Sequence, residues 1–173
     1  MNNQPQLQSP ITARRYHDIS CGHRVHGHES KCAHLHGHNY RVHFTVAAKQ
    51  GYQSVDGLGR VLDFSVIKSE LCMWLEENWD HKFLAWDQDS YMKGIYEDLG
   101  MHSAMDAHQI MFADSIVWVP FNPTAENMAM YLVEEIGPQQ LAGTAVELIE
   151  VTIEETAKCW ATYTKPFARR ESL

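Results

Sequence analysis

The alternation of side chains between His36 and Ala47 constrains the fold of this chain more than any other feature. The even-numbered positions from 36 to 46 carry two histidines, a tyrosine and three apolar residues, whereas most positions between them are small or polar. A period of two is typical of a β-strand with one buried face. The pattern therefore predicts a strand in which His36 and His38 point to the same side of a sheet.

Three other segments have the composition of strands, and the glycines between positions 51 and 60 indicate turns. The predicted strands are Arg14–His23, Val146–Glu155 and Cys159–Thr164. The segment Gly51–Arg60 is expected to be a turn-rich connection that joins two strands as a hairpin.

Two helices are predicted between these strands. Asp63 is a suitable N-cap for a helix over Phe64–Asn78. Asn122 and Pro123 predict a second helix, with Asn as N-cap and Pro at the first helical position, which ends at Gly137-Pro138. Residues 83–121 are harder to interpret, with a short helix expected over Ser90–Leu99 and a strand over Ser115–Val119. The order of elements predicts an α+β fold, with helices covering one face of an antiparallel sheet.

The composition bounds the class of protein. A chain of 173 residues with 45% hydrophobic residues fits a single domain over 1–173. No apolar stretch approaches the ~20 residues that span a bilayer, and residues 1–10 have no signal-peptide pattern, so a cytoplasmic protein without membrane contact is expected. The four cysteines show neither CxxC pairing nor scaffold density, which suits reduced thiols.

Charge and histidine content are uneven along the chain. The net charge of −8 argues against a nucleic-acid partner, because phosphate neutralisation needs a basic surface. Residues 1–49 nevertheless carry six Lys or Arg against two Asp or Glu, and eight of the eleven histidines lie between His17 and His43. A small anionic ligand is therefore compatible with this end of the chain.

The histidines suggest a metal site. Two histidines at i and i+2 of a strand and a third from a neighbouring strand provide three corners of a Zn²⁺ tetrahedron, which leaves the fourth open for water or substrate. We predict His36 and His38 with His23 as third ligand, because only this pair leads directly into an alternating strand. The pair His26 and His28 is the alternative. A finger-type structural site would need four protein ligands in CxxC or HxxxH spacing, and the sequence has no CxxC pair to complete such a set.

Several other residues can carry chemistry. Cys32 lies beside Lys31 in a histidine-rich segment, a setting that favours the thiolate, whereas Cys72 falls within a predicted helix and suits an inert core thiol. Asp80 and His81 place a carboxylate next to an imidazole. Glu155 is an acidic residue at the end of an apolar strand face that is expected to include Ile149, Val151 and Ile153. It is either exposed to solvent there or anchors a ligand.

Together these motifs resemble the family of 6-pyruvoyltetrahydropterin and 6-carboxytetrahydropterin synthases. The resemblance runs in order from about Arg15 to Tyr163, with an insertion at about 86–115, and it rests on Cys32-x3-His36-Gly37-His38, Val61-Leu62-Asp63-Phe64, Asp80-His81, Asn122-Pro123-Thr124-Ala125-Glu126-Asn127 and Glu154-Glu155-Thr156. It implies the tunnelling fold, a four-stranded antiparallel sheet with two helices on one face, whose copies join into an oligomeric barrel, here expected to be a homohexamer.

The resemblance also implies roles for the candidate residues. His23, His36 and His38 would bind zinc, Cys32 would be the base, Asp80 and His81 would activate it or relay protons, and Glu155 would hold the pterin ring. The substrate would be 7,8-dihydroneopterin triphosphate, with Arg24, Lys31 and Lys82 as candidate triphosphate ligands.

The spacing between Cys32 and His36 favours one branch of the family. Three intervening residues are associated with the 6-carboxy branch. Enzymes of this branch release acetaldehyde, and their pterin product is used in the biosynthesis of queuosine and other deazapurines. The alternatives are the 6-pyruvoyl branch of the tetrahydrobiopterin pathway and, in another class, a non-catalytic histidine-rich metal-binding protein.

Overall fold

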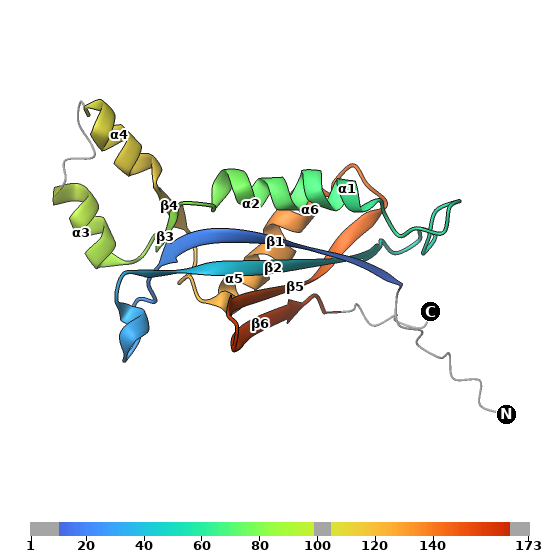
Figure 1. Ribbon diagram of the computed structural model, residues 1–173, viewed down its shortest axis with the longest axis horizontal. Coiled ribbons are helices and arrows are strands. Elements are labelled where there is room, and N and C mark those ends of the chain that lie inside the picture. The colour runs from blue at the N-terminus through green and yellow to red at the C-terminus, as the bar shows by residue number, and fades with distance from the viewer. Residues whose placement is uncertain (1–10, 99–104, 167–173) are drawn as a thin grey trace, which may run out of the picture.

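Four consecutive antiparallel strands form one side of a six-stranded sheet in the computed structural model, which describes residues 11–98 and 105–166. The strand order is β4-β3-β1-β2-β5-β6 (Figure 1). The strands are β1 (Thr12–His23), β2 (His36–Ala48), β3 (Phe83–Trp86), β4 (Ile116–Val119), β5 (Val146–Thr156) and β6 (Cys159–Thr164). The expected α+β class and the four antiparallel strands are confirmed. The sheet is nevertheless mixed, because the short strands β3 and β4 extend it in parallel beside the end of β1.

The pairing of β1 with β2 brings distant histidines together. His23 lies directly opposite His36, and Cys21 lies opposite His38. Cross-strand partners in an antiparallel pair share one face of the sheet. His23, His36 and His38 therefore project from the same face, at the end of the sheet where β2 begins.

Two interrupted helices cover this face and build the core with it. The first consists of α1 (Phe64–Ile67), the π-helical turn η2 (Lys68–Cys72) and α2 (Met73–Asn78), and the Asp63 side chain accepts the Ser65 N–H as its N-cap. The second consists of α5 (Ala125–Tyr131), the π-helical turn η3 (Leu132–Ile136) and α6 (Gly137–Gln140). Apolar residues of both helices pack against alternate residues of the strands, including Tyr40, Val42 and Phe44.

The predicted ends of the second helix are wrong. Thr124, not Asn122, is the N-cap, and its side chain accepts the Asn127 N–H. The Asn122 side chain instead bonds both the N–H and the carbonyl of His26, which ties two segments together. The helix also continues past Gly137-Pro138, because a glycine has no Cβ to clash with the following proline ring.

Two expectations for the strands are also corrected. Residues 51–60 do not join two strands, because the chain runs from β2 through this loop into α1, and Asp56 closes the loop by accepting the N–H groups of Leu58 and Arg60. The register of β5 shifts against β2 between Leu148 and Glu150. Leu148 is therefore buried with Val151, and Ile149 does not share their face.

The predicted insertion forms its own small unit at one end of the sheet. Residues 86–115 contain the expected short helix as α3 (Ser90–Asp98) and an additional helix α4 (Ala107–Asp114), and β4 follows them within the expected strand. Figure 1 shows α3 and α4 standing apart from the helices that cover the sheet. Leu99, in the predicted helix, lies outside the described residues. In the described part of the chain, every helix is too short or too polar to cross a bilayer.

Candidate metal centre and active site

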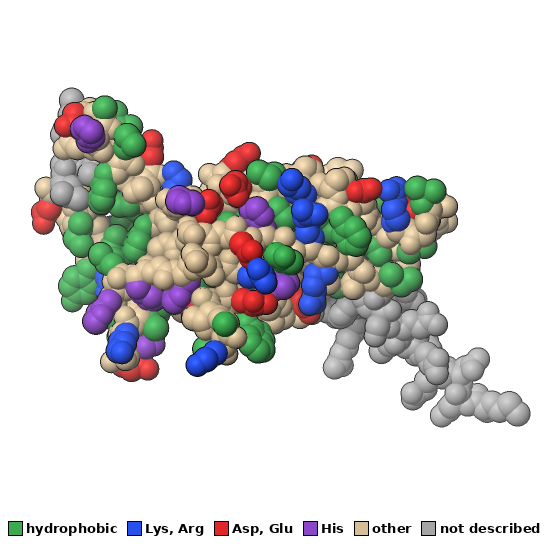
Figure 2. Space-filling view, viewed as in Figure 1, with side chains coloured by type: hydrophobic (Ala, Val, Ile, Leu, Met, Phe, Trp, Pro, Cys, Tyr) green, Lys and Arg blue, Asp and Glu red, His purple; other side chains and the backbone are tan. Residues whose placement is uncertain are grey.

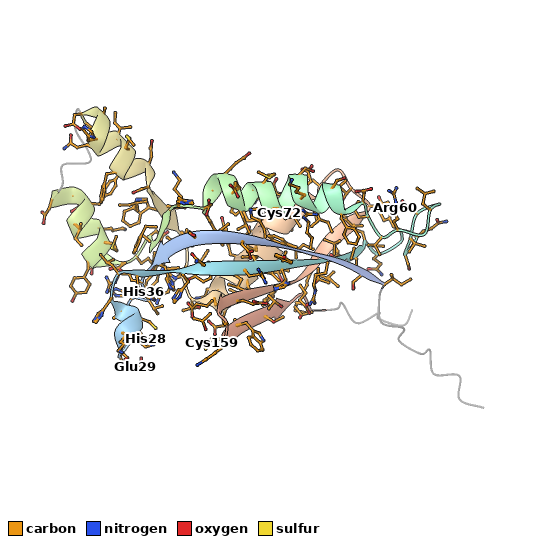
Figure 3. The ribbon with its side chains drawn as sticks, viewed as in Figure 1. His28, Glu29, His36, Arg60, Cys72 and Cys159 are labelled. Atoms are coloured by element: carbon orange, nitrogen blue, oxygen red, sulfur yellow. The ribbon has the colours of Figure 1, made fainter. Side chains whose placement is uncertain are left out.

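Three histidines converge where β1 ends and β2 begins. One ring nitrogen of each of His23, His36 and His38 lies within 4.8 Å of the others. His23 is buried at 1% exposure, whereas the other two are partly accessible. Figure 3 shows His36 at this end of the sheet, and Figure 2 shows histidine side chains gathered there. The group could hold a metal ion while leaving one side accessible.

Backbone carbonyls fix the tautomers of two of these histidines. The Nδ1 atom of His23 lies 2.6 Å from the carbonyl oxygen of Pro123, and Nδ1 of His36 lies 2.7 Å from that of His34. A carbonyl only accepts, so each Nδ1 carries the hydrogen and each Nε2 keeps its lone pair. This arrangement is typical of metal-bound histidines.

The buried Nε2 atom of His23 tests whether the site fits a metal. It is inaccessible and has no hydrogen-bond partner among the described residues. An unsatisfied buried acceptor costs free energy, and a metal ion at the centre of the triad would satisfy it. The donor set of three imidazoles is one that zinc binds well.

Burial favours the neutral form of two triad residues, His23 and His38. Desolvation lowers the pKa of His23, although the hydrogen bond to Pro123 acts in the opposite direction. Desolvation also lowers the pKa of His38, against the opposing charge of Glu155. The neutral imidazole is the form that ligates a metal.

Glu155 borders the triad from β5. Its Oε1 lies 3.5 Å from Nε2 of His23 and 3.6 Å from Nε2 of His38, and the Tyr40 hydroxyl donates to the same oxygen at 3.5 Å. Burial, followed by the charge of Glu155, raises the pKa of Tyr40, so its hydroxyl remains a donor. Glu154 points to the opposite face, where it contacts His43 at 2.7 Å.

Cys32 lies on the loop between β1 and β2, the two strands that carry the triad. It is part of the short helix η1 (Lys31–Ala33), four residues before His36, and is partly exposed. The other cysteines differ in environment. Burial raises the pKa of Cys21 to about 12 and also raises that of Cys72, whereas Cys159 is exposed. Cys32 is thus a partly accessible thiol on the loop that leads into His36 and His38.

Asp80 and His81 form a dyad at the edge of β1. Nδ1 of His81 lies 2.6 Å from Oδ2 of Asp80, and Oδ1 of Asp80 accepts the Ser20 N–H at 2.8 Å. Burial acts to raise the pKa of Asp80, but these hydrogen bonds outweigh it and lower the pKa. The His81 side chain is 82% exposed, with a backbone φ of 55°.

His81 and His38 line the same open hollow of about 510 Å³. Among the described residues, no hydrogen bond links the dyad to the triad or to Cys32.

The remaining histidines and cations lie outside the triad. His26 contacts the buried carboxylate of Asp89 at 3.2 Å, and His28 accepts the Ser30 N–H. Arg24 also pairs with Asp89, and Lys82 donates to the Asp114 carbonyl. Arg24 and Lys82 are therefore already engaged within the chain, and Lys31 is exposed.

Sequence reasoning missed three contributors to this region. The Pro123 carbonyl fixes a tautomer, Tyr40 contacts Glu155, and Asp89 binds two residues of the histidine-rich loop. Only Asp89 had a local signal, because an aspartate directly before a predicted helix is a typical N-cap.

Comparison with known proteins assigns the family. Residues 12–166 match the model of the 6-pyruvoyl tetrahydropterin synthase family. The chain is 33% identical over 150 residues to the 6-carboxy-5,6,7,8-tetrahydropterin synthase of Rickettsia bellii, covering 87% of this chain and 97% of the relative. It is 28% identical over 130 residues to the enzyme of that name from Haemophilus influenzae, covering 74% of this chain and 84% of the relative.

Solved structures share the fold. An uncharacterized protein of Wolinella succinogenes superimposes with a TM-score of 0.74 at 22% identity, covering 90% of this chain and 98% of that one. The 6-pyruvoyl tetrahydropterin synthase of Caenorhabditis elegans superimposes with a TM-score of 0.58 at 25% identity, covering 90% and 96%. The chain therefore belongs to the 6-pyruvoyl tetrahydropterin synthase family.

Proposed function

We propose that this protein is a zinc-dependent 6-carboxy-5,6,7,8-tetrahydropterin synthase. It would convert 7,8-dihydroneopterin triphosphate to 6-carboxytetrahydropterin, acetaldehyde and triphosphate. The observation that carries the metal requirement is the buried Nε2 of His23 beside His36 and His38, which has no hydrogen-bond partner among the described residues. The relatives that carry this enzyme name support the choice of reaction.

Each candidate residue has a role in this proposal. His23, His36 and His38 would hold the metal, which when bound supplies Lewis acidity toward the hydroxyls of the substrate side chain. The Cys32 thiolate would accept a proton from the adjacent substrate carbon. Glu155 would accept two parallel hydrogen bonds from the ring N–H and exocyclic amino group of the pterin.

The Asp80–His81 dyad would serve proton transfer. The Asp80 carboxylate orients the imidazole through Nδ1, which leaves Nε2 of His81 directed to solvent or substrate. Because the dyad has no hydrogen bond to Cys32 within the described residues of one chain, we infer that the complete site forms in an assembly of copies, for which we expect a homohexamer.

Product identity separates the two branches of the family. The family model and the Caenorhabditis elegans structure carry the 6-pyruvoyl name, so this reaction is the second candidate. Purified protein loaded with zinc should be incubated with 7,8-dihydroneopterin triphosphate and the pterin identified by mass. We expect 6-carboxytetrahydropterin with acetaldehyde. A 6-pyruvoyl product would select the other branch, and zinc binding without turnover would favour a non-catalytic metal-binding protein.

A further inference from the structure

A buried ion pair connects the insertion to the loop that carries Cys32. Asp89 precedes α3 and is only 1% exposed, and the side chain of Arg24, which follows the proposed ligand His23, is 14% exposed. Nη1 of Arg24 donates to both carboxylate oxygens of Asp89, at 3.1 and 2.8 Å. Charged groups this well buried persist only when they are well paired.

The same arginine reaches the residue next to Cys32. Nε of Arg24 donates to the carbonyl of Ala33 at 3.0 Å, while the N–H of Val25 donates to the carbonyl of Cys32 at 2.8 Å. Two consecutive carbonyls of the thiol-bearing turn are thus held by two consecutive residues after β1. These bonds tie the backbone around Cys32 to the residues that directly follow His23.

The insertion anchors the other end of this connection. Oδ1 of Asp89 accepts the N–H groups of Tyr91 and Met92 in the first turn of α3, at 3.0 and 3.2 Å. The guanidinium of Arg24 also lies over the Tyr91 ring, 5.6 Å from its centroid. The carboxylate is therefore fixed by a helix rather than by a free loop.

We propose that Arg24 and Asp89 are positioning residues that hold the Cys32 thiol in place for the reaction, so that the insertion acts on catalysis from outside the site. This inference rests on the proposed function of Cys32. A displacement of about 1 Å of a reacting group costs up to ~10²-fold in rate. Loss of the connection should therefore lower kcat with little effect on KM, because the Arg24 guanidinium is already engaged by Ala33 and Asp89 and is not free to bind the triphosphate of the substrate.

Two variants and a matched control test the proposal. Asp89→Asn removes the charge of the acceptor, and Arg24→Lys keeps a cation but loses the fork that reaches both Asp89 and Ala33. The control is Asp56→Asn, because Asp56 likewise binds an arginine, Arg60, and two backbone N–H groups. Arg60 lies at the opposite end of the molecule from His36 (Figure 3).

The readouts are zinc content, kcat, KM and the iodoacetamide labelling of Cys32 relative to the exposed Cys159. We expect both variants to retain zinc, to lose about 10- to 100-fold in kcat with KM within about threefold of the parent, and to label Cys32 severalfold faster relative to Cys159. Asp56→Asn should match the parent. If Asp89→Asn does not fold, Arg24→Lys alone decides.

Failure of the positioning role can be distinguished from failure of the proposed enzyme function. A folded Arg24→Lys protein with parental kcat and an unchanged labelling ratio would overturn the positioning role. If the parent protein makes no pterin product, the proposed function fails, and the labelling ratio then decides the proposal by itself: a raised ratio supports it and an unchanged ratio overturns it.

Discussion

At the scale of single residues, Cys32 separates catalysis from metal binding. It lies on the loop between the two strands that carry the triad, but it is not one of the triad residues. Cys32→Ala should therefore retain zinc and stability while losing turnover by about 10²-fold or more, the usual effect of removing a positioned base. Steady-state kinetics with metal analysis provide the test. Cys159→Ala, at an exposed thiol, should leave turnover unchanged. Parental turnover in Cys32→Ala would remove it from the mechanism.

The neighbours Glu154 and Glu155 provide a matched pair for substrate binding. Glu155 faces the triad and Glu154 faces His43 on the other side of the sheet. Glu155→Gln should raise KM by about 10-fold or more, because the amide presents a donor where the pterin also presents a donor and charged bonds are stronger than neutral ones. Glu154→Gln should change KM little. Equal effects of the two variants would contradict the assignment, as would loss of zinc in Glu155→Gln.

The low pKa values of His23 and His38 predict how the metal-free protein responds to acid. In the unfolded chain these groups titrate near the ordinary histidine pKa of ~6.5, and folding lowers both values. Protons therefore bind the unfolded state more readily as pH falls below ~6.5. The free energy of unfolding should decrease by at most about 1.4 kcal/mol per pH unit for each group until the folded pKa is passed. Urea unfolding at several pH values between 7.5 and 5 measures this free energy. A plot of the free energy of unfolding against pH should be shallower for His23→Gln than for the parent. If the free energy of unfolding depends on pH in the same way in the parent and the variant, the lowered pKa of His23 is contradicted.

At the scale of elements, two helical glycines should respond in opposite ways to alanine. A Cβ at Gly137 in α6 would lie 2.8 Å from Cβ of Leu148, whereas a Cβ at Gly94 in α3 would meet no atom within 4 Å. Gly137→Ala should lower the free energy of unfolding by about 1–3 kcal/mol through overpacking. Gly94→Ala should raise it by about 0.5–1 kcal/mol, because alanine loses less backbone entropy in a helix. Denaturant unfolding of both variants checks the signs, and stabilisation by Gly137→Ala would contradict the close packing of α6 on β5.

The elements also show which features of the fold the sequence can reveal. The strand β2 was predictable from its period of two, β1, β5 and β6 from their strand-like composition, and the first helix from its cap at Asp63. The same alternation predicted that His36 and His38 share a face. The register shift in β5 was not predictable, because a bulge leaves no mark in the composition, and it moved Ile149 off the expected face.

Features that depend on contacts between distant segments were also missed. The strand β3 and helix α4 are short, and β3 is fixed by parallel pairing with β1 and β4 rather than by its own pattern. Asn122 and Thr124 are equally suitable caps by residue type, and only the contact of Asn122 with the backbone of His26 decides between them. In the same way, the Pro123 carbonyl beside His23 follows from the tertiary fold alone.

At the scale of the whole molecule, open strand edges predict assembly. Among the described residues, β3 pairs with β1 only at Gly22 and His23, and β6 is the last strand on the other side of the sheet. Long unpaired edges are usually covered. Light scattering coupled to size exclusion should therefore give a multimer, with a homohexamer as the expected state. A monomer that retains full turnover would contradict an active site completed by neighbouring copies.

The central claim is that His23, His36 and His38 hold the metal on which turnover depends. Elemental analysis of the purified protein tests it most directly, with each of these residues replaced by alanine and a His26→Ala/His28→Ala double variant as control. The parent and the control should each contain one zinc per chain, and the three triad variants should lose both zinc and turnover. Retention of zinc by the triad variants, with its loss from the control, would contradict the account.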